Sequence, residues 1–403
     1  MDSMKKLAFL SAAMAFSVAE TGQAAVALDP QAFNLEPFRF IPTLQVAATQ
    51  DSNIYRLSEN EVSSFITVIK PTFDLVTQDR DNTYSVRYAL AAGIYGEGDN
   101  NYLDNMFSLN AHVEPTGRFR VDVGAGYNLL HDDLGTAFTE GLSQAQLEAR
   151  GGPDKYNLAT LNGGVEYGAK DAAGQVALNL NYGQKRYDAE DAAAARDLDT
   201  LSGLLGFRLR VMPKTKALLD FEYEKGDYSN ATTAAVSDYT GNAWFLGLMW
   251  ESTASTTGKI RLGNNKRDTA DGDGISGFAW DVGVIWTPLE RSRFTLDGSR
   301  RLQDGTLPTI SIDGRNLAAG WEHDWSDRVE SKLTAGLGIE DHTRLPGTGI
   351  RNDDSLTLGF VVNYQLRRWA VLGAGISKTD RDSTMDIYDY DRAVFSLNAQ
   401  LSL

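Results

Sequence analysis

The sequence contains no cysteine and few prolines, 10 among its 403 residues. Without cysteine the chain has neither a disulfide framework nor the lipid-bearing residue of a lipoprotein, so its fold must depend on packing and hydrogen bonds. Its four histidines, His112, His131, His323 and His342, belong to no HExxH, GxSxG or Walker pattern. The sequence therefore predicts a protein that is not an enzyme and that needs no cofactor.

Long hydrophobic runs are also missing after the N-terminus, which argues against a helical membrane protein. Near the N-terminus, two lysines precede an apolar run from Leu7 to Val18, and small residues follow it. This pattern predicts a secretory signal peptide over residues 1–25, cleaved after Ala24 or Ala25 rather than Ala27. The alternative is a membrane anchor, but the run is about twelve residues long and a bilayer core needs roughly twenty.

The chain has fewer basic than acidic residues, 38 against 54, and its formal net charge is −16. A chain this acidic is a poor ligand for nucleic acid, so no nucleic-acid partner is expected. The mean hydropathy of −0.30 is too low for a bundle of membrane helices. It is compatible with a transmembrane barrel, in which only alternate residues face lipid.

Strict alternation is the dominant pattern that is present. In residues 118–129 the odd positions are apolar or aromatic and the even positions are polar or glycine, and 278–286, 356–364 and 395–403 keep the same period. A two-residue period indicates strands that are apolar on one side only. We predict an all-β fold, a transmembrane antiparallel up-and-down barrel of about eighteen strands, because an even count returns both ends to one side.

The barrel is predicted to span residues 38–403, after a short periplasmic segment at 26–37. Connections support it, because tight turns alternate with longer stretches as periplasmic turns and outer loops do. The tight turns lie at 114–117, 212–215, 288–291, 326–327 and 366–368, and the longer stretches at 131–154, 188–197, 229–238, 342–353 and 381–388. A soluble sandwich or propeller has no reason to alternate in this way.

We expect the polar face of each strand to line the pore and the apolar face to contact lipid. A soluble core could not bury the polar face without unpaired charges, so we expect this face to be wet or tightly cross-paired. The predicted pore-lining residues are Arg87, Arg118, Arg120, Asp122, Asn162, Glu166, Asn179, Asn181, Arg208, Arg210, Asp220, Glu222, Glu224, Arg261, Arg267, Asp281, Arg293, Asp297, Arg301 and Lys332. The predicted membrane girdle is Tyr127, Trp244, Trp250, Trp280, Trp286 and Tyr364.

The mixed signs on the polar face leave two interpretations open. Arg208 and Arg210 would stand beside the acidic residues of the next strand, either as ion pairs that brace the wall or as contacts for anionic sugars or phosphates. Aromatic residues that could stack on sugars are few there, Phe245 and Tyr95. The longest loop, 131–154, could fold inward and constrict the pore or lie outside as a surface feature.

Acidic loop tips suggest calcium binding, but the pattern is incomplete. Asp271-Gly272-Asp273-Gly274 lacks the downstream bidentate glutamate of a calcium loop, and the cluster from Asp380 to Asp389 has no loop motif. We therefore expect solvated charged loops and no metal.

One short segment carries a family resemblance. Phe38-Arg39-Phe40-Ile41-Pro42-Thr43-Leu44 leads to Asp51-Ser52-Asn53-Ile54-Tyr55-Arg56. This extended strand running into a D-x-N turn resembles the opening of the β-barrel porins found with exopolysaccharide gene clusters. The resemblance implies an outer-membrane component of polysaccharide synthesis or export, and it assigns no catalytic residues.

Three functions compete at this point. The first is a conduit or scaffold for exopolysaccharide export, with a polysaccharide substrate and a periplasmic export partner. The second is a diffusion porin for small solutes, and the third is a structural or adhesive surface barrel. Each places the chain in the bacterial outer membrane, in contact with lipid and lipopolysaccharide.

Overall fold

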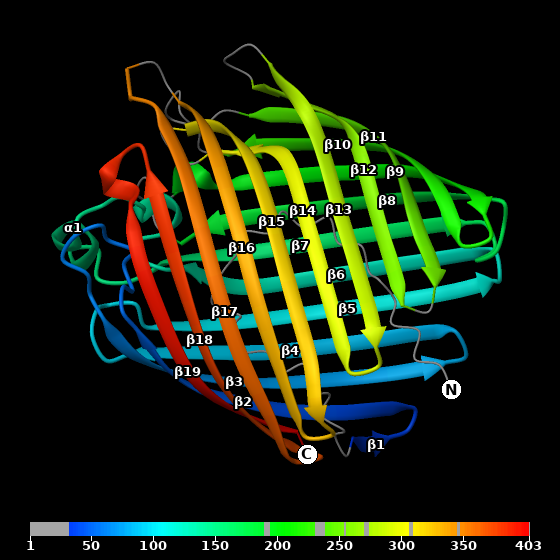
Figure 1. The fold of residues 1–403 in the computed structure, drawn as a ribbon, viewed down its shortest axis with the longest axis horizontal. Coiled ribbons are helices and arrows are strands. Elements are labelled where there is room, and N and C mark those ends of the chain that lie inside the picture. The colour runs from blue at the N-terminus through cyan, green and yellow to red at the C-terminus, as the bar shows by residue number, and fades with distance from the viewer. Residues whose placement is uncertain are drawn as a thin grey trace.

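Strands β2 to β19 each pair antiparallel with the next strand along the chain, and β19 pairs with β2, so the sheet closes on itself (Figure 1). The computed structural model describes residues 32–188, 194–229, 238–253, 255–269, 274–305, 309–344 and 347–402. Within these residues the wall has eighteen strands, which confirms the predicted barrel. The predicted signal peptide lies outside the described residues.

Each of the alternating stretches 118–129, 278–286, 356–364 and 395–403 lies largely within one strand. The strands are β2 (Phe38–Asp51), β3 (Ser64–Asp79), β4 (Asn82–Tyr95), β5 (Tyr102–Thr116), β6 (Phe119–Asp132), β7 (Asp154–Tyr167), β8 (Gly174–Tyr187), β9 (Leu198–Met212), β10 (Thr215–Tyr228), β11 (Tyr239–Thr253), β12 (Thr256–Thr269), β13 (Ile275–Leu289), β14 (Ser292–Asp304), β15 (Thr309–Ser326), β16 (Val329–Arg344), β17 (Arg351–Arg367), β18 (Ala370–Ser383) and β19 (Tyr390–Ser402). A further strand, β1 (Phe33–Leu35), pairs with the start of β2.

Helical structure in the described residues is limited to short pieces in the connections. They are η2 (Ala137–Thr139), α1 (Gln144–Glu148), η3 (Ala194–Arg196) and η4 (Asp386–Tyr388). None of the helices in these described stretches is long and apolar enough to span a membrane.

The connections divide the barrel into two ends. Two-residue turns such as 213–214 and 290–291 join strands at one end, the turn end, where the C-terminus also lies (Figure 1). The longer connections, including 52–63 and 133–153, gather at the other, the loop end, together with α1. In transmembrane barrels the longer loops face the outside of the cell, so we orient the loop end outward.

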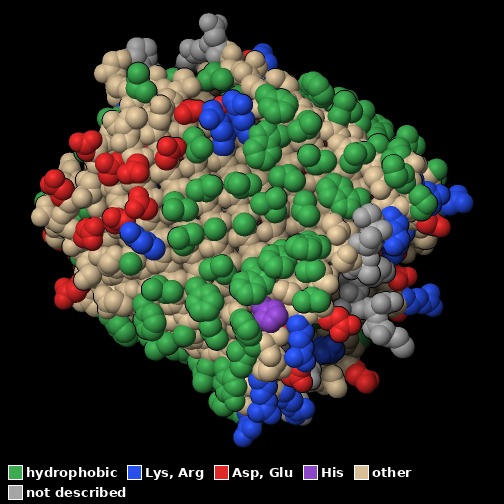
Figure 2. Space-filling model, viewed as in Figure 1, with side chains coloured by type: hydrophobic (Ala, Val, Ile, Leu, Met, Phe, Trp, Pro, Cys, Tyr) green, Lys and Arg blue, Asp and Glu red, His purple; other side chains and the backbone are tan. Residues whose placement is uncertain are grey.

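The outer surface carries an apolar belt. Phe207, Leu246 and Leu397 are among many large apolar side chains that are 40–56% exposed on this surface (Figure 2). Aromatic rings form rows near the turn end, where Phe294 lies 5.2 Å from Trp286 and 6.2 Å from Trp321 between ring centroids. Exposed apolar area on this scale requires an apolar environment, which a lipid bilayer provides.

The first and last strands meet at a seam that no loop connects covalently. Nine residue pairs join β2 to β19, from Asp51–Val394 to Thr43–Ser402. Side chains reinforce its outer end, where Arg392 Nη2 lies 2.6 Å from an Asp51 carboxylate oxygen. The Asn53 amide donates to the carbonyl oxygens of Leu57 (2.8 Å) and Asp391 (3.0 Å). The D-x-N turn therefore ties the loop after β2 to the start of β19.

Candidate functional site: the inner wall and its outer mouth

Arg118 lies in the turn between β5 and β6, and the other predicted pore-lining residues lie on the face opposite the apolar belt. Contacts between strands that are not neighbours demonstrate that this face points inward. Arg301 on β14 lies 2.5 Å from Glu222 on β10, four strands away, and Lys216 on β10 donates to Gln175 on β8 at 2.6 Å. Such contacts are possible only across the concave side of a curved wall.

The inner wall includes both wet and cross-paired regions. Asn162, Asn179, Asn181, Arg210 and Glu224 are exposed to solvent, as are Arg87 and Asp122. By contrast, Arg120, Asp220, Arg261 and Arg267 are buried. Most of the remaining candidates are half-buried, and many are in ion pairs. Glu166 pairs with Arg120. Lys332 and Arg293 both pair with Glu322.

A network of ion pairs spans β9 to β14, and we name it the inner charge network: Arg208, Asp220, Glu222, Arg261, Asp281 and Arg301. The Arg261 guanidinium is its centre, at 2.8 Å from Asp220, 2.9 Å from Glu222 and 2.6 Å from Asp281. Arg301 adds contacts to Glu222 and to Asp281, and Arg208 pairs with Asp220. Three carboxylates thus share three guanidinium groups and the ammonium of Lys259, which lies 3.3 Å from Asp281. This arrangement braces the wall.

The strand register corrects part of the expected pairing. Arg210 stands opposite Lys216, not beside an acidic residue, and Glu224 accepts a hydrogen bond from the Tyr239 hydroxyl at 2.7 Å. Phe245 is fully buried between Arg261 and Arg301, each 4.7 Å from its ring centroid. Because the two cations cover this ring, it offers no open face to a sugar.

The structure places the predicted girdle residues on the outer surface. Tyr127, Trp244, Trp286 and Tyr364 are 40–54% exposed there. Trp250 and Trp280 are half-buried because their rings lie over Gly258 and Gly298 of the neighbouring strands. Trp280 stands opposite Arg300, towards the loop end, whereas Trp286 packs in the aromatic row at the turn end.

Three loops pack together over the outer mouth. The buried side chains of Ile54, Tyr55 and Leu57 from loop 52–63 form one hydrophobic cluster with Leu134 and Leu147 from the loop between β6 and β7. The Tyr55 hydroxyl accepts a hydrogen bond from the Asp99 amide at 3.1 Å, and burial raises the pKa of this tyrosine. Loop 133–153 is therefore packed against its neighbouring loop through buried side chains.

A second set of contacts carries this loop towards the far strands, and we name it the loop latch: Glu140, Arg351, Asp353 and Arg381. The Glu140 carboxylate lies 3.0 Å from Arg351 and 2.8 Å from Arg381, on β17 and β18. Asp353 pairs with both arginines. The latch spans the outer ends of β19 and β2 to β5, so the loop folds inward across the mouth rather than lying outside.

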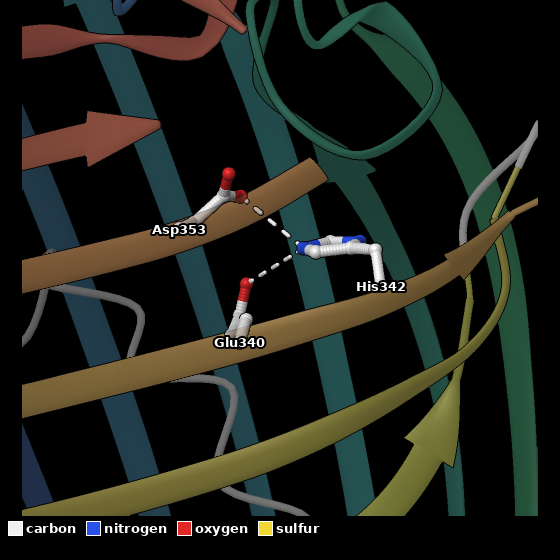
Figure 3. A group of neighbouring side chains, drawn as sticks. All are labelled: Glu340, His342 and Asp353. Atoms are coloured by element: carbon white, nitrogen blue, oxygen red, sulfur yellow. Dashed lines mark ion pairs between the residues drawn. The ribbon is translucent and has the colours of Figure 1, made fainter. Parts of the chain in front are cut away.

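One cluster in the described residues has the composition of a metal site. Potential ligand atoms of Glu340, His342 and Asp353 lie within 4.8 Å of one another (Figure 3). The His342 Nε2 atom is 3.2 Å from Asp353 and 3.6 Å from Glu340. However, Asp353 also binds Arg351 at 2.7 Å, Arg381, and the Ser383 hydroxyl at 2.6 Å. Two guanidinium groups already neutralise the carboxylates and would repel a cation, so we assign this cluster to the latch.

Sequence reasoning did not identify the latch or the loop cluster. Glu140 is 211 and 241 residues from its two arginines, so no local pattern could have paired them. Apolar residues in an otherwise polar loop, such as Leu134 and Leu147, were a usable signal. Asp271 and Asp273, which suggested calcium, lie outside the described residues.

Taken together, the closed antiparallel barrel, its apolar belt and its hydrophilic inner wall define an outer-membrane-type β-barrel. The family model described as "Putative beta-barrel porin 2" matches residues 29–403, and the chain belongs to this family. No curated protein matches the sequence.

Solved structures give low similarity over most of the chain. The ferric citrate transporter FecA, unliganded, has 11% identity and a TM-score of 0.46 over 87% of this chain, which spans only 61% of FecA. Pseudomonas aeruginosa OpdL has 11% identity and a TM-score of 0.47, covering 92% of this chain and 99% of OpdL. OpdQ from the same organism has 9% identity and a TM-score of 0.48, covering 91% and 98%.

Proposed function

We propose that this protein is an outer-membrane channel through which small hydrophilic solutes diffuse passively. The observation that carries the proposal is the combination of a wet, polar inner wall with a packed loop across the outer mouth. Exposed side chains such as Asn162 and Asn181 give solutes a hydrated path. Loop 133–153 would set the size limit, since its hydrophobic cluster and its latch hold it in place. The proposal includes no catalytic step.

Polysaccharide export is the second candidate, because part of the inner wall is uncharged. On the turn-end side of the latch and of the Asp51–Arg392 pair, the inward residues of β17 to β19 and β2 offer hydroxyl and amide groups, among them Thr357, Gln365, Ser396 and Gln45. Such groups hydrogen-bond neutral sugars without the cost of desolvating a charge. A polymer would need the loop to move aside or to leave a gap, and a periplasmic partner would have to supply energy.

Single-channel conductance of the purified protein in planar bilayers distinguishes these candidates. Neutral and anionic polysaccharides are added to one side in turn. Steps that are indifferent to polymer support the diffusion channel, whereas block by polymer supports export. Absence of conductance in folded protein contradicts both and favours the structural or adhesive barrel.

A further inference from the structure

The negative charge of this chain collects at the loop end. Two of the loops over the outer mouth, 52–63 and 96–101, expose Glu59, Glu61, Glu97 and Asp99. Within the described part of the chain, no lysine or arginine lies in ion-pair range of these four carboxylates. Figure 2 shows Asp and Glu side chains gathered on the left, towards the loop end. The outer mouth therefore has an uncompensated negative field.

The turn end carries charges of both signs. Exposed Arg118, Lys214, Arg328 and Arg368 lie in or beside the short turns, and they are mixed there with aspartates such as Asp81. Figure 2 shows Lys and Arg side chains at the lower right, towards this end, with Asp and Glu side chains among them. The net charge of −16 is thus not spread evenly along the barrel axis.

The inner wall does not reverse the field of the mouth. Its buried cations are held by carboxylates, as Arg120 is by Glu166 at 2.5 Å and Arg267 is by Asp304 at 2.9 Å. In the inner charge network, three carboxylates likewise hold three guanidinium groups and the Lys259 ammonium. A solute that enters from outside therefore meets negative charge first and a nearly balanced wall afterwards.

We infer that the channel selects for cations and that the solutes it admits best are small cations, such as protonated amines. This inference rests on the proposed function and deepens it by naming the solute class. No carboxylate is assigned as a ligand, because the effect is that of a field, which extends about 10 Å in 0.1 M salt. Anionic and phosphorylated sugars would be disfavoured at the same mouth.

The size of the effect follows from the potential at the mouth. Charge-lined openings reach potentials of several kT, and even about one kT enriches a monovalent cation roughly 2.7-fold and depletes an anion equally. The permeability ratio of K⁺ to Cl⁻ should then be about 7 in 0.1 M salt. It should approach one at 1 M, where the screening length shrinks to about 3 Å.

The experiment is the reversal potential of single channels in a KCl gradient, measured for wild type and two matched variants. The first combines Glu59→Gln, Glu61→Gln, Glu97→Gln and Asp99→Asn. The second makes the same change in net charge at the turn end, with Asp81→Asn, Asp171→Asn, Glu251→Gln and Glu290→Gln, all at exposed positions. We expect the loop variant to lose at least about half of the cation preference and the turn variant to keep it.

The outcomes separate the two claims. Absence of conductance in folded wild type contradicts the proposed function. A conducting wild type that is unselective or prefers Cl⁻ overturns the inference alone. Equal loss in both variants also overturns it, because the loops would then not be the source of the preference.

Discussion

Glu140→Gln should release loop 133–153 from the far side of the mouth while leaving its hydrophobic cluster intact. The wild-type carboxylate accepts from Arg351 at 3.0 Å and from Arg381 at 2.8 Å, and its side chain is only 24% exposed. Replacing it with a neutral amide of the same shape removes two charge-assisted hydrogen bonds, each worth about 1.5–3 kcal/mol. Arg351 and Arg381 keep Asp353, so we expect the latch to lose about 2 kcal/mol in total.

A loss of about 2 kcal/mol corresponds to a roughly 30-fold larger population of released loop. Amide hydrogen exchange over residues 133–153 measures this population directly, and it does so whether or not the protein conducts. Exchange in this loop should accelerate roughly 10- to 100-fold, while the strands keep their protection. In bilayers the same variant should show larger or noisier conductance.

Glu148→Gln is the matched control, because Glu148 is an exposed acid of the same loop whose side chain accepts only from Gln144, at 2.8 Å, among the described residues. Its exchange should match that of wild type. If Glu140→Gln also exchanges at the wild-type rate, the latch does not hold the loop and the reasoning is wrong.

Three further predictions concern stability. Arg261→Ala leaves buried carboxylates without their shared cation and should lower the free energy of unfolding by about 3–5 kcal/mol in urea titrations, whereas Arg87→Ala, at a side chain that is 60% exposed, should cost about 0–1 kcal/mol. Leu147→Ala should destabilise the loop cluster by about 2–5 kcal/mol and raise loop exchange, and Ile350→Ala, at an exposed site, should not; equal effects would argue against the cluster. Burial alone would raise the pKa of Asp133, but the contact with His131 and the nearby arginines lower this pKa. The ionised Asp133 therefore stabilises the folded loop fully above about pH 4, and this contribution is lost as the pH falls below that value. Loop exchange should accelerate between pH 4 and pH 2 after correction for intrinsic rates, and unchanged protection would contradict this assignment.

The wall of this barrel was predictable because its determinants are local. Alternation such as that of residues 118–129 assigns each side chain to one face, and a polar face with the charge of Arg261 or Asp220 can only be wet or paired. Tight turns such as Pro213-Lys214 then set which ends of the strands meet. These features need no knowledge of distant residues, so the alternation and the turns predict a closed barrel of about eighteen strands, as the structure shows.

The mouth was not predictable for the opposite reason. The fold of loop 133–153 depends on Leu134 and Leu147 meeting Tyr55, and its position depends on Glu140 meeting two arginines that follow more than 200 residues later. Register has the same character, because a strand shifted by one pair changes which charges face each other. Arg210 was therefore expected beside an acid but stands opposite Lys216.

The seam between β2 and β19 has a consequence for how the barrel is made. Every other pair in the wall is joined by a connection in the chain, but this pair must find its register between the two ends of the polypeptide. Asp51 meets Arg392 only when that register is correct, because a shift of one residue would turn the arginine side chain to the opposite face. The same shift would move the Asp391 carbonyl oxygen away from the Asn53 amide. The D-x-N turn thus favours correct closure of the barrel. Closure in the wrong register leaves the buried Asp51 carboxylate without Arg392 and removes one of the two hydrogen bonds that the Asn53 amide donates, so the barrel is less stable.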